Sequence, residues 1–412
     1  MKTKPHPLDV PLAVVGVDYK SACSAYRGDL VTAKEERTNL FVSIKSIDPD
    51  AGFIALETCN RVEWIVSTEQ PEWMASLLTA KMASRWREKR PDLLHYPIPS
   101  IYIGDEAARH IFRLVAGLES FVPGEAQIAG QFQRALGDAR KLDSSSIILN
   151  GLSGIAGRAA KFSYRIGVQS NKRRGIHGLV LKFIDAHFGG ELSGKRIGVL
   201  GMGEIGRRSA ALIEEALNAK VVKINRTVAE KNRGEWRPIV ELPDIILELD
   251  ALVVATGSRE PVVSARELSI PKRMPPLLIL DIGVPRQVSH DIEELKGVDY
   301  RNIDDLMKIN LEAVDRTAIA NLEGEIEKFV SQFKRFCRER NMVVFLDRTR
   351  KRHYEITERQ IPDFISTHLG KLEPAARKKV ETELKRMFRT YTNEVFDSIH
   401  AALEDYFGKS GG

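Results

Sequence analysis

The spacing of apolar residues predicts an α+β fold for about the first 150 residues of the chain. Short apolar runs at 12–17 and 53–56 are typical of strands, and residues 62–66 alternate apolar with polar side chains. Residues 29–47 and 72–89 carry apolar positions at helical spacing. Strands and helices are therefore expected in mixed order.

After Gly104 the pattern becomes mostly helical. Residues 107–115 place their apolar members on one face, and a further helix is expected at 126–141. Residues 145–180 are basic and indicate a helical connector to the next part of the chain.

A different pattern begins after this connector. Residues 196–200 are typical of a buried strand, a glycine-rich loop follows directly, and 207–217 have the spacing of a helix. Further strands are expected at 220–224, 251–255 and 277–282. Strands that alternate with helices predict a parallel, doubly wound sheet.

The last hundred residues indicate long helices. From 304 to about 340 there is no proline and one glycine, Gly324, so a continuous amphipathic helix with a seam for a partner helix is expected. Helices are also expected at 375–389 and 392–406. The apolar residues that recur at spacings of three and four in the first segment are Leu311, Val314, Ala318, Leu322, Ile326, Phe329, Phe333 and Phe336.

Composition fits a globular protein of 412 residues, 43% hydrophobic and 29% charged. No apolar run approaches the roughly 20 residues that a membrane-spanning helix needs. The apolar stretch at 11–16 is too short for a secretory signal and favours a first strand. Three cysteines favour a reducing, cytoplasmic compartment, and they argue against a disulfide framework or a structural zinc site.

The net charge of +6 is compatible with a polyanionic partner without establishing one. Basic residues concentrate at 158–174, where Lys172, Arg173 and Arg174 end the run, and at 335–352. Such runs are either solvated helix faces or contacts to a polyanion, and the sequence leaves both interpretations open.

A G-x-G-x-x-G motif stands between a predicted strand and a predicted helix, which is the context of a dinucleotide site. Gly201 permits the tight turn, Gly203 lets the backbone approach a pyrophosphate, and Gly206 allows close packing of helix on strand. The candidate cofactor-binding residues of this loop are Gly201, Met202, Gly203, Glu204, Ile205 and Gly206.

The end of the second strand favours NADP(H) over NAD(H). Asn225, Arg226 and Thr227 occupy the place where an NAD site has a carboxylate, and Arg226 can pair with a 2′-phosphate. The alternative is that Arg226 is an ordinary surface residue. Residues 255–258 and 281–286 end later strands and suit either a cofactor wall or simple turns.

Cys59 lies at the junction of two predicted strands, beside Arg61. Access and a nearby positive charge are the ingredients of a thiolate nucleophile. Taken alone, a small buried cysteine is an equally good interpretation. His110 is a lone histidine on a predicted helix and, taken alone, favours a structural role.

The surroundings of Cys59 resemble a known family. Thr58-Cys59-Asn60-Arg61 is similar to the signature of the glutamyl-tRNA reductases, and so are residues 110–120 and 124–131. The other similar segments, in the same order as in the family, are 16–22 with Arg27, 225–227, 281–286 and 303–306. The resemblance covers about residues 12–310.

The resemblance implies an enzyme that reduces glutamyl-tRNA(Glu) to glutamate-1-semialdehyde with NADPH and releases tRNA, the first step of 5-aminolevulinate and porphyrin biosynthesis from glutamate. Cys59 would attack the aminoacyl ester and form a thioester, which hydride then reduces. His110 would act as an acid, a base or a positioning group. The implied glutamate pocket comprises Thr58, Asn60, Arg61, Ser120, Glu125, Ala126, Gln127 and Gln131.

Within that pocket, Arg61 is expected to clamp a substrate carboxylate, and Glu125 is expected to receive the α-ammonium group. Gln127 and Gln131 are four residues apart and should share one helix face.

The resemblance also implies a multidomain α/β architecture. We expect an α+β catalytic and substrate-binding domain at 1–165, a Rossmann-type NADP-binding domain at 166–303, and the end of a spinal helix with a helical dimerisation domain at 304–412. The implied partners are glutamyl-tRNA(Glu), a second copy in a homodimer, and the aminotransferase that consumes the semialdehyde. No membrane partner and no metal are expected.

The chain departs from the family pattern at several places, which suggests a divergent branch. Tyr19 replaces the usual histidine, Cys23 and Ala126 stand where proline is usual, Pro123 replaces an aliphatic residue, and Gly283 replaces the commoner alanine. None of these changes affects Cys59, His110 or Arg61.

Two other functions remain open from the sequence. One is an NADP-dependent reductase of a free small molecule with a domain like that of shikimate dehydrogenase. The other is a non-catalytic relative that binds tRNA or pathway enzymes and regulates flux.

Overall fold

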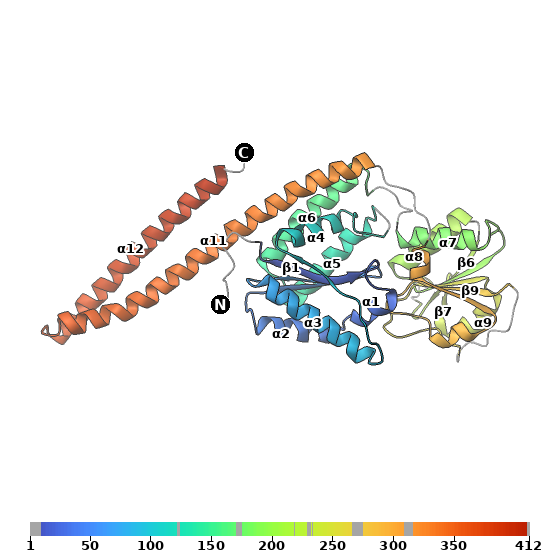
Figure 1. Cartoon of the computed structure of the whole chain (residues 1–412), viewed down its shortest axis with the longest axis horizontal. Helices are drawn as coiled ribbons and strands as arrows, with labels where there is room; N and C mark the ends of the chain where they lie inside the picture. The colour runs from blue at the N-terminus through green and yellow to red at the C-terminus, as the bar shows by residue number, and fades with distance from the viewer. Residues whose placement is uncertain are drawn as a thin grey trace. The chain divides into compact units, whose positions relative to one another are not determined.

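Two β-sheets organise the larger part of the molecule (Figure 1). The computed structural model describes residues 10–121, 124–169, 175–217, 219–228, 232, 234–265, 275–308 and 316–409, and within them the chain forms two compact units. One unit spans Pro11–Phe333, and the other is built chiefly from the segment that begins at Lys334. The predictions made for Pro123, residues 172–174, Leu311 and Val314 lie outside the described residues.

The first sheet, in the described part of the chain, has four antiparallel strands in the order β2-β3-β1-β4. Their bounds are β1 (Leu12–Asp18), β2 (Gly52–Glu57), β3 (Arg61–Ser67) and β4 (Ser100–Ile103). Every residue of β3 is buried, including the polar residues that alternate with its apolar ones. The strands at 12–17, 53–56 and 62–66 are thereby confirmed.

Helices cover both faces of this sheet (Figure 1). Apolar side chains of β1, β2 and β3 pack with α2 and α3 in one buried cluster, and α4, α5 and α6 lie on the opposite face. The bounds are α1 (Ser24–Leu30), α2 (Lys34–Lys45), α3 (Pro71–Lys89), α4 (Asp105–Val115), α5 (Gln127–Lys141) and α6 (Ile147–Arg165).

The helix predicted at 29–47 is confirmed as α2, but it begins only at Lys34, because the chain breaks between α1 and α2. Val31 and Ala33 are extended there. Both the main-chain N–H and the hydroxyl of Thr32 donate to Glu57 Oε1, at 3.1 and 2.5 Å. These bonds to the end of β2 outweigh the helical pattern on either side.

The second sheet, again among the described residues, has six parallel strands in the order β10-β9-β8-β5-β6-β7. This confirms the parallel sheet expected from the alternating pattern. Chain order reverses between β5 and β8, which is where such sheets bind ligands. The bounds are β5 (Arg196–Leu200), β6 (Lys220–Asn225), β7 (Trp236–Pro238), β8 (Ala251–Val254), β9 (Leu277–Asp281) and β10 (Val298–Asn302).

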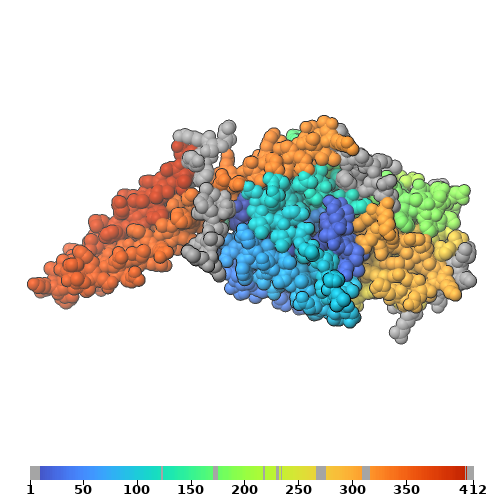
Figure 2. Space-filling view, in the orientation of Figure 1, coloured from blue at the N-terminus to red at the C-terminus, as the bar shows by residue number. Residues whose placement is uncertain are grey.

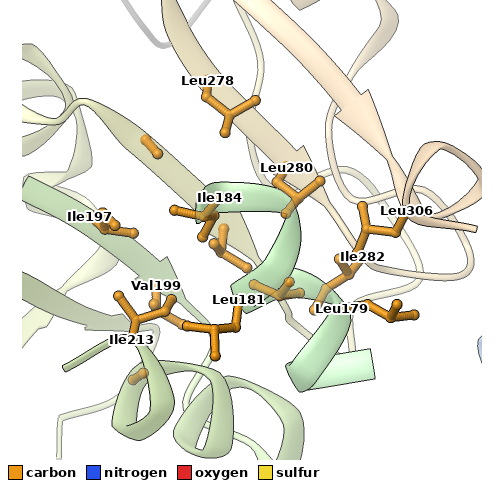
Figure 3. Close-up of a cluster of buried hydrophobic side chains, with 14 of the residues drawn as sticks. Leu179, Leu181, Ile184, Ile197, Val199, Ile213, Leu278, Leu280, Ile282 and Leu306 are labelled. Atoms are coloured by element: carbon orange, nitrogen blue, oxygen red, sulfur yellow. The ribbon is translucent and has the colours of Figure 1, made fainter. Parts of the chain in front are cut away.

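Figure 3 shows how one face of this sheet is covered. Leu179, Leu181 and Ile184 of α7 (Ile176–His187) meet the apolar side chains of β5 and β9, and Ile213 of α8 (Glu204–Leu217) joins the same cluster. Leu306 of the short α10 (Ile303–Leu306) also belongs to it. The other face packs on short helical turns between 239 and 248 and at 290–294, including α9 (Leu242–Ile245).

The helix expected from 304 to about 340 is wrong at both ends. In the described residues α10 ends at Leu306, and α11 (Arg316–His368) continues well beyond 340. In the larger unit, Phe329 and Phe333 of α11 pack their rings edge-on against Phe112, with centroids 6.4 and 6.1 Å away. The seam is therefore filled by α4.

The smaller unit is a helical hairpin of the later part of α11 with α12 (Pro374–Lys409), coloured orange to red in Figure 2. Glu358 accepts from Lys385 (2.8 Å) and Arg389 (3.1 Å) across the hairpin. The two helices predicted at 375–389 and 392–406 are one continuous helix, α12, within which the Thr392 hydroxyl donates to Phe388 O (2.7 Å). Among the described helices, none has a stretch both long and apolar enough for a membrane crossing.

Candidate functional site

The turn that carries Cys59 connects β2 to β3 and is held by its own polar groups. Thr58 N donates to Arg61 O (2.8 Å), and Thr58 Oγ1 accepts from Asn60 N and Arg61 N, both at 3.2 Å. From outside the turn, Tyr19 N donates to Asn60 O (2.8 Å). Cys59 is thus fixed at the end of a buried sheet, with its side chain partly exposed.

The electrostatic surroundings of Cys59 differ from the sequence-based expectation. Burial raises the pKa of the Cys59 thiol to about 12, the charge of Glu125 adds to this, and Arg27 and Arg61 oppose it only in part. A neighbouring arginine was expected to favour the thiolate. The charge of Arg61 does not outweigh burial and Glu125, because the Arg61 guanidinium is directed to other groups.

Arg61, Glu63 and His110 form a buried charged cluster. Arg61 Nη1 donates to Glu63 Oε1 (2.7 Å), and Arg61 Nη2 donates to Glu119 O. Glu63 Oε1 also contacts His110 Nε2 (3.0 Å). The exposed fractions of Arg61, Glu63 and His110 are 1%, 4% and 5%, so water screens little of their interaction.

The same cluster determines the protonation state of Glu63. Burial alone would raise the pKa of Glu63, but His110 and Arg61 outweigh it and hold the pKa at about 2. His110 is also stacked on Tyr102, with ring centroids 4.1 Å apart and planes 8° apart. The imidazole is therefore fixed on one face by Tyr102 and at Nε2 by a carboxylate.

The other residues expected in the glutamate pocket differ in how exposed they are. Ser120 and Glu125 are buried, and so is Gln127 at the start of α5, whereas Gln131 is partly exposed and Ala126 is exposed. Burial raises the pKa of Glu125 to about 7, against a smaller opposing effect of Arg61. Gln127 is best oriented to donate to Glu125 Oε1 (3.1 Å) and accept from Arg208 Nη1 (2.9 Å).

Sequence reasoning missed Glu63, Tyr102 and Glu119, and it gave Arg27 no role. Arg61 and Glu63 are two apart in a strand and so point to the same face. A pair of opposite charges at that spacing in a strand whose other residues are apolar was the available signal for Glu63. Tyr102 and Glu119 left no comparable signal.

A second site is a cavity of about 300 Å³ at the carboxyl ends of β5, β6 and β8. Gly201, with a φ of 100°, makes the turn after β5, and Met202 N is 3.4 Å from Asn225 Oδ1. Among the described residues, no acidic side chain lines the cavity. Its lining comprises Leu200, Gly201, Met202, Gly203, Asn225, Arg226, Ile239, Ala255, Thr256, Gly257, Ser258 and Val262.

Most of the predicted cofactor residues surround this cavity. Glu204, Ile205 and Gly206 instead begin α8 behind the loop, and Thr227 accepts from Asn225 Nδ2 (2.9 Å) at its margin. Residues 255–258 form a wall of the cavity, as one of the two interpretations from sequence had it. Asp281 shapes the next turn by accepting from the main-chain N–H groups of 283, 287 and 288.

The glycines of the loop match a close backbone approach. A Cβ at Gly206 would lie 1.8 Å from Gly201 O, whereas a Cβ at Gly203 would meet nothing within 4 Å. Gly206 therefore serves helix packing, and Gly203 leaves open space beside the cavity for a ligand. The residues present fit a dinucleotide.

Comparisons with known proteins match the two parts of the chain that carry these sites. The family model described as glutamyl-tRNAGlu reductase, N-terminal domain, matches residues 15–164, and the model described as shikimate / quinate 5-dehydrogenase matches residues 184–309. The glutamyl-tRNA reductase of Exiguobacterium sp. is 26% identical over 403 residues, covering 95% of this chain and 89% of that protein. That of Bacillus subtilis is 28% identical over 394 residues, covering 91% and 86%.

Over nearly its whole length, the chain is similar to the glutamyl-tRNA reductases. It is accordingly an oxidoreductase, and it works with a nicotinamide cofactor. A solved structure of the glutamyl-tRNA reductase from Methanopyrus kandleri is 24% identical, covers 97% of this chain and 98% of that chain, and has a TM-score of 0.43.

Among the positions at which this chain departs from the glutamyl-tRNA reductase pattern, the structure describes Tyr19, Cys23, Ala126 and Gly283. Tyr19 packs edge-on against Phe121, with centroids 5.2 Å apart, and contacts the turn through its main chain. Cys23 is exposed at the start of α1, and Ala126 is exposed at the start of α5. The buried cluster of Arg61, Glu63 and His110 keeps its contacts beside these departures.

Proposed function

We propose that this protein reduces glutamyl-tRNA(Glu) to glutamate-1-semialdehyde with NADPH, releases tRNA, and so begins the formation of 5-aminolevulinate and porphyrins from glutamate. The observation that carries the proposal is a partly exposed Cys59 on a rigid turn, with Arg61 and Glu125 close enough to influence its charge. The similarity to glutamyl-tRNA reductases and the cavity that fits a dinucleotide support it.

In the first chemical step, the Cys59 sulfur bonds to the ester carbonyl carbon and the bond from that carbon to the ribose oxygen breaks. The thiol proton passes to the ribose oxygen, so tRNA leaves with its hydroxyl restored. The glutamyl group stays on the chain as a thioester. An aminoacyl ester is already activated, and covalent catalysis divides the reduction into two easier steps.

Activation of Cys59 is proposed to depend on the substrate. A pKa of about 12 keeps the free thiol protonated at neutral pH, and the charge of Glu125 is one cause. An α-ammonium group placed against Glu125 compensates that charge and lowers the pKa of Cys59. The thiol would then react fastest when glutamate occupies the pocket.

Arg61 would meet the substrate carboxylate with the N–H groups that Glu63 and Glu119 leave over, since each terminal nitrogen carries two. Within the described residues, Asn60 Oδ1 is buried and accepts no hydrogen bond, which suits it to a substrate donor. His110 would act by positioning Arg61 through Glu63. The remaining proposed pocket residues are Thr58, Ser120, Ala126, Gln127 and Gln131.

For the cofactor, Gly201, Met202 and Gly203 would cradle the pyrophosphate at the start of α8. Arg226, which is exposed at the cavity, would pair with the 2′-phosphate of NADPH, with Asn225 and Thr227 beside the ribose. NADPH, when bound, would supply the hydride that converts the thioester to the aldehyde, while the Cys59 sulfur takes up one proton.

A single-turnover experiment tests this function. Protein is mixed with glutamyl-tRNA, first without NADPH and then with it. We expect a glutamyl thioester on the Cys59 peptide by mass spectrometry, followed by semialdehyde. Cys59→Ser should abolish both, and Cys23→Ser, a change at an exposed thiol, should abolish neither. Absence of the thioester from the wild-type protein contradicts the mechanism.

The same experiment decides between the alternatives. The raised pKa of Cys59 is the observation that favours a non-catalytic relative, which would bind glutamyl-tRNA without releasing it. A reductase of a free small molecule would oxidise NADPH without charged tRNA. Formation of semialdehyde excludes the first, and dependence on charged tRNA excludes the second.

We also propose a homodimer held by the hairpin of α11 and α12. Large apolar side chains are exposed along it, among them Phe345, Phe364, Met387 and Tyr391. Large apolar side chains exposed on a helical hairpin can serve as an interaction site. Light scattering of the wild-type protein should give twice the mass of one chain. Phe364→Glu should lower the measured mass toward that of one chain. A wild-type protein with the mass of one chain contradicts the dimer.

The exposed basic face of α6, with Arg158, Lys161 and Arg165, is the proposed contact for tRNA. Binding of tRNA should weaken steeply as the salt concentration rises, and a flat salt response contradicts this contact.

We also propose that the aminotransferase which consumes the semialdehyde docks on this protein, because the aldehyde product is unstable in solution. The three free cysteines favour a cytoplasmic location.

A further inference from the structure

The short helix α1 connects the Cys59 turn to the sheet that carries the cofactor cavity. Its Arg27 is fully buried, and each nitrogen of its guanidinium donates one bond. Nε donates to Cys59 O (3.1 Å), Nη1 to Ala22 O (2.5 Å) and Nη2 to Asp304 Oδ1 (3.2 Å). One side chain thus joins the main chain of the nucleophile to a carboxylate 277 residues away in sequence.

Asp304 is firmly attached to the cofactor sheet. It lies in α10, whose Ile303 and Leu306 are fully buried in the cluster on that sheet (Figure 3). Capping of α10 is performed by Asn302 and Asp305, so Asp304 is not needed for it. Instead, Asp304 Oδ2 accepts from both Ser24 N (2.9 Å) and Ser24 Oγ (2.7 Å) at the start of α1.

Two further contacts meet the same region of the chain. A Cβ at Gly28 would lie 3.0 Å from Pro285 Cα, so α1 packs directly on the turn after β9. Arg259, next to the wall of the cavity, donates to Thr32 O (2.8 Å). Arg259, Pro285 and Asp304 follow β8, β9 and β10, at the strand ends where a parallel sheet holds its ligand.

We propose that Arg27 is a positioning residue which, through Asp304, aligns the Cys59 turn with the cofactor domain for hydride transfer. This inference rests on the proposed function. In the proposed function, thioester formation uses groups between Thr58 and Gln131, whereas reduction needs the acyl carbon and the hydride donor at a defined separation. A displacement of about 1 Å between reacting groups can lower a rate about 100-fold.

The test measures acylation of Cys59 and reduction of the thioester separately in the Asp304→Asn variant. Without NADPH, the rate at which glutamyl-tRNA acylates Cys59 should stay within about threefold of wild type. When NADPH is added to the acylated protein, the rate of aldehyde formation should fall about 100-fold. A readout independent of turnover is hydrogen exchange, which should become faster at 19–32 and 58–61 in the cofactor-free protein.

Asp305→Asn is the matched control. It lies in the same helical turn, and its bonds go to Asn302 and Lys308 within its own segment. Both steps and both exchange patterns should stay as in wild type. Ser24→Ala removes one donor to Asp304 at a partly exposed position, so it should give a smaller loss in the reduction step alone. Arg27→Lys keeps the positive charge but replaces the three guanidinium nitrogens by one ammonium nitrogen. The lysine cannot reproduce the bonds to Cys59 O, Ala22 O and Asp304 together, so reduction should be slower than in wild type.

Equal step rates and equal hydrogen exchange in wild type, Asp304→Asn and Ser24→Ala overturn the inference. So does a parallel fall of both steps, which would mean a purely structural role. These outcomes leave the proposed function standing, because wild type still forms thioester and aldehyde. A wild-type protein that forms neither refutes the proposed function instead, and the exchange data then decide whether Asp304 holds the Cys59 turn.

Discussion

The Cys59 turn and the glycine loop after β5 are surrounded by different kinds of residue. Around the turn, Arg27, Arg61, Glu63 and Glu125 are charged or titratable groups with little or no exposure. Around the cavity, the lining is main chain, uncharged side chains and one exposed arginine, Arg226. The first region should therefore be sensitive to charge at constant volume, and the second to volume at constant charge.

The largest effect is expected from Gly206→Ala in the glycine loop. The added Cβ would lie 1.8 Å from Gly201 O, which is a main-chain atom, and the Cβ itself is fixed directly to the main chain of α8. Either the loop or α8 must move, which should lower the free energy of unfolding by about 5 kcal/mol. Chemical denaturation measures it.

Gly203→Ala is the control for that change, since its Cβ meets no protein atom within 4 Å. Its free energy of unfolding should stay within about 0.5 kcal/mol of wild type. Because the new methyl group faces the expected pyrophosphate, NADPH affinity should fall about tenfold, or about 1.4 kcal/mol. Equal stability losses for the two alanines would refute the distinction between packing and ligand approach.

Next in size is Glu63→Gln, which changes charge and not volume. It leaves Arg61 buried without its anion, at a cost of about 4 kcal/mol above pH 4.5. The contribution of Glu63 in wild type should be lost as pH falls from 4.5 toward about 2, because its folded pKa is the lower one.

Glu106→Gln removes the exposed carboxylate that pairs with Arg109 at 2.6 Å and makes a matched comparison. The free energy of unfolding of this variant should fall by no more than about 1 kcal/mol. Similar urea midpoints for Glu63→Gln and Glu106→Gln would mean that burial does not distinguish the two pairs.

A smaller effect of opposite sign is expected from Glu125→Gln. The pKa of Glu125 rises from 4.5 to about 7 on folding. Between these values the folded chain holds more protons than the unfolded chain, so wild type loses about 3 kcal/mol of stability as pH rises through this range. Glutamine has no such proton to lose, and the variant should match wild type near pH 4.5 and exceed it above pH 7.

Thermal unfolding across that range measures the slope for Glu125→Gln. Glu72→Gln, at an exposed position of α3, should keep the wild-type slope. If the slope survives in Glu125→Gln, another group causes it.

The smallest effect is expected from Arg226→Ala at the rim of the cavity. Loss of an exposed partner for the 2′-phosphate should reduce the preference for NADPH over NADH about tenfold, with unfolding unchanged. Fluorescence titration with both cofactors measures the ratio. A preference that is unaffected would place the 2′-phosphate elsewhere.

Much of the fold follows from periodicity. Strands β1, β2, β3, β5 and β8 are buried almost throughout, and buried strands leave an apolar run that is visible in sequence. The strands β4, β7 and β10 lie at sheet edges and are largely unburied; β7 and β10 carry no such run, and the run in β4 is only three residues long. That is why none of them was predicted.

The site divides in the same way. Cys59 and the loop glycines stand in contiguous motifs, so local sequence was enough to find them. The partners of Arg27 and His110 come from other strands and helices, which a single sequence does not reveal. The direction of the Cys59 pKa shift was also out of reach, because it depends on burial and on Glu125 rather than on the adjacent Arg61.

One further consequence concerns Gly16, which stands opposite Glu63 in the pairing of β1 with β3. A methyl group at position 16 would come within 2.7 Å of Glu63 Cγ and 2.4 Å of Val62 O. The hydrogen atom at position 16 is what makes room for the anion between Arg61 and His110. Because the shortest of these contacts is with a main-chain atom, changing the side chain at 63 would not make room for a larger residue, and position 16 should stay glycine across an alignment.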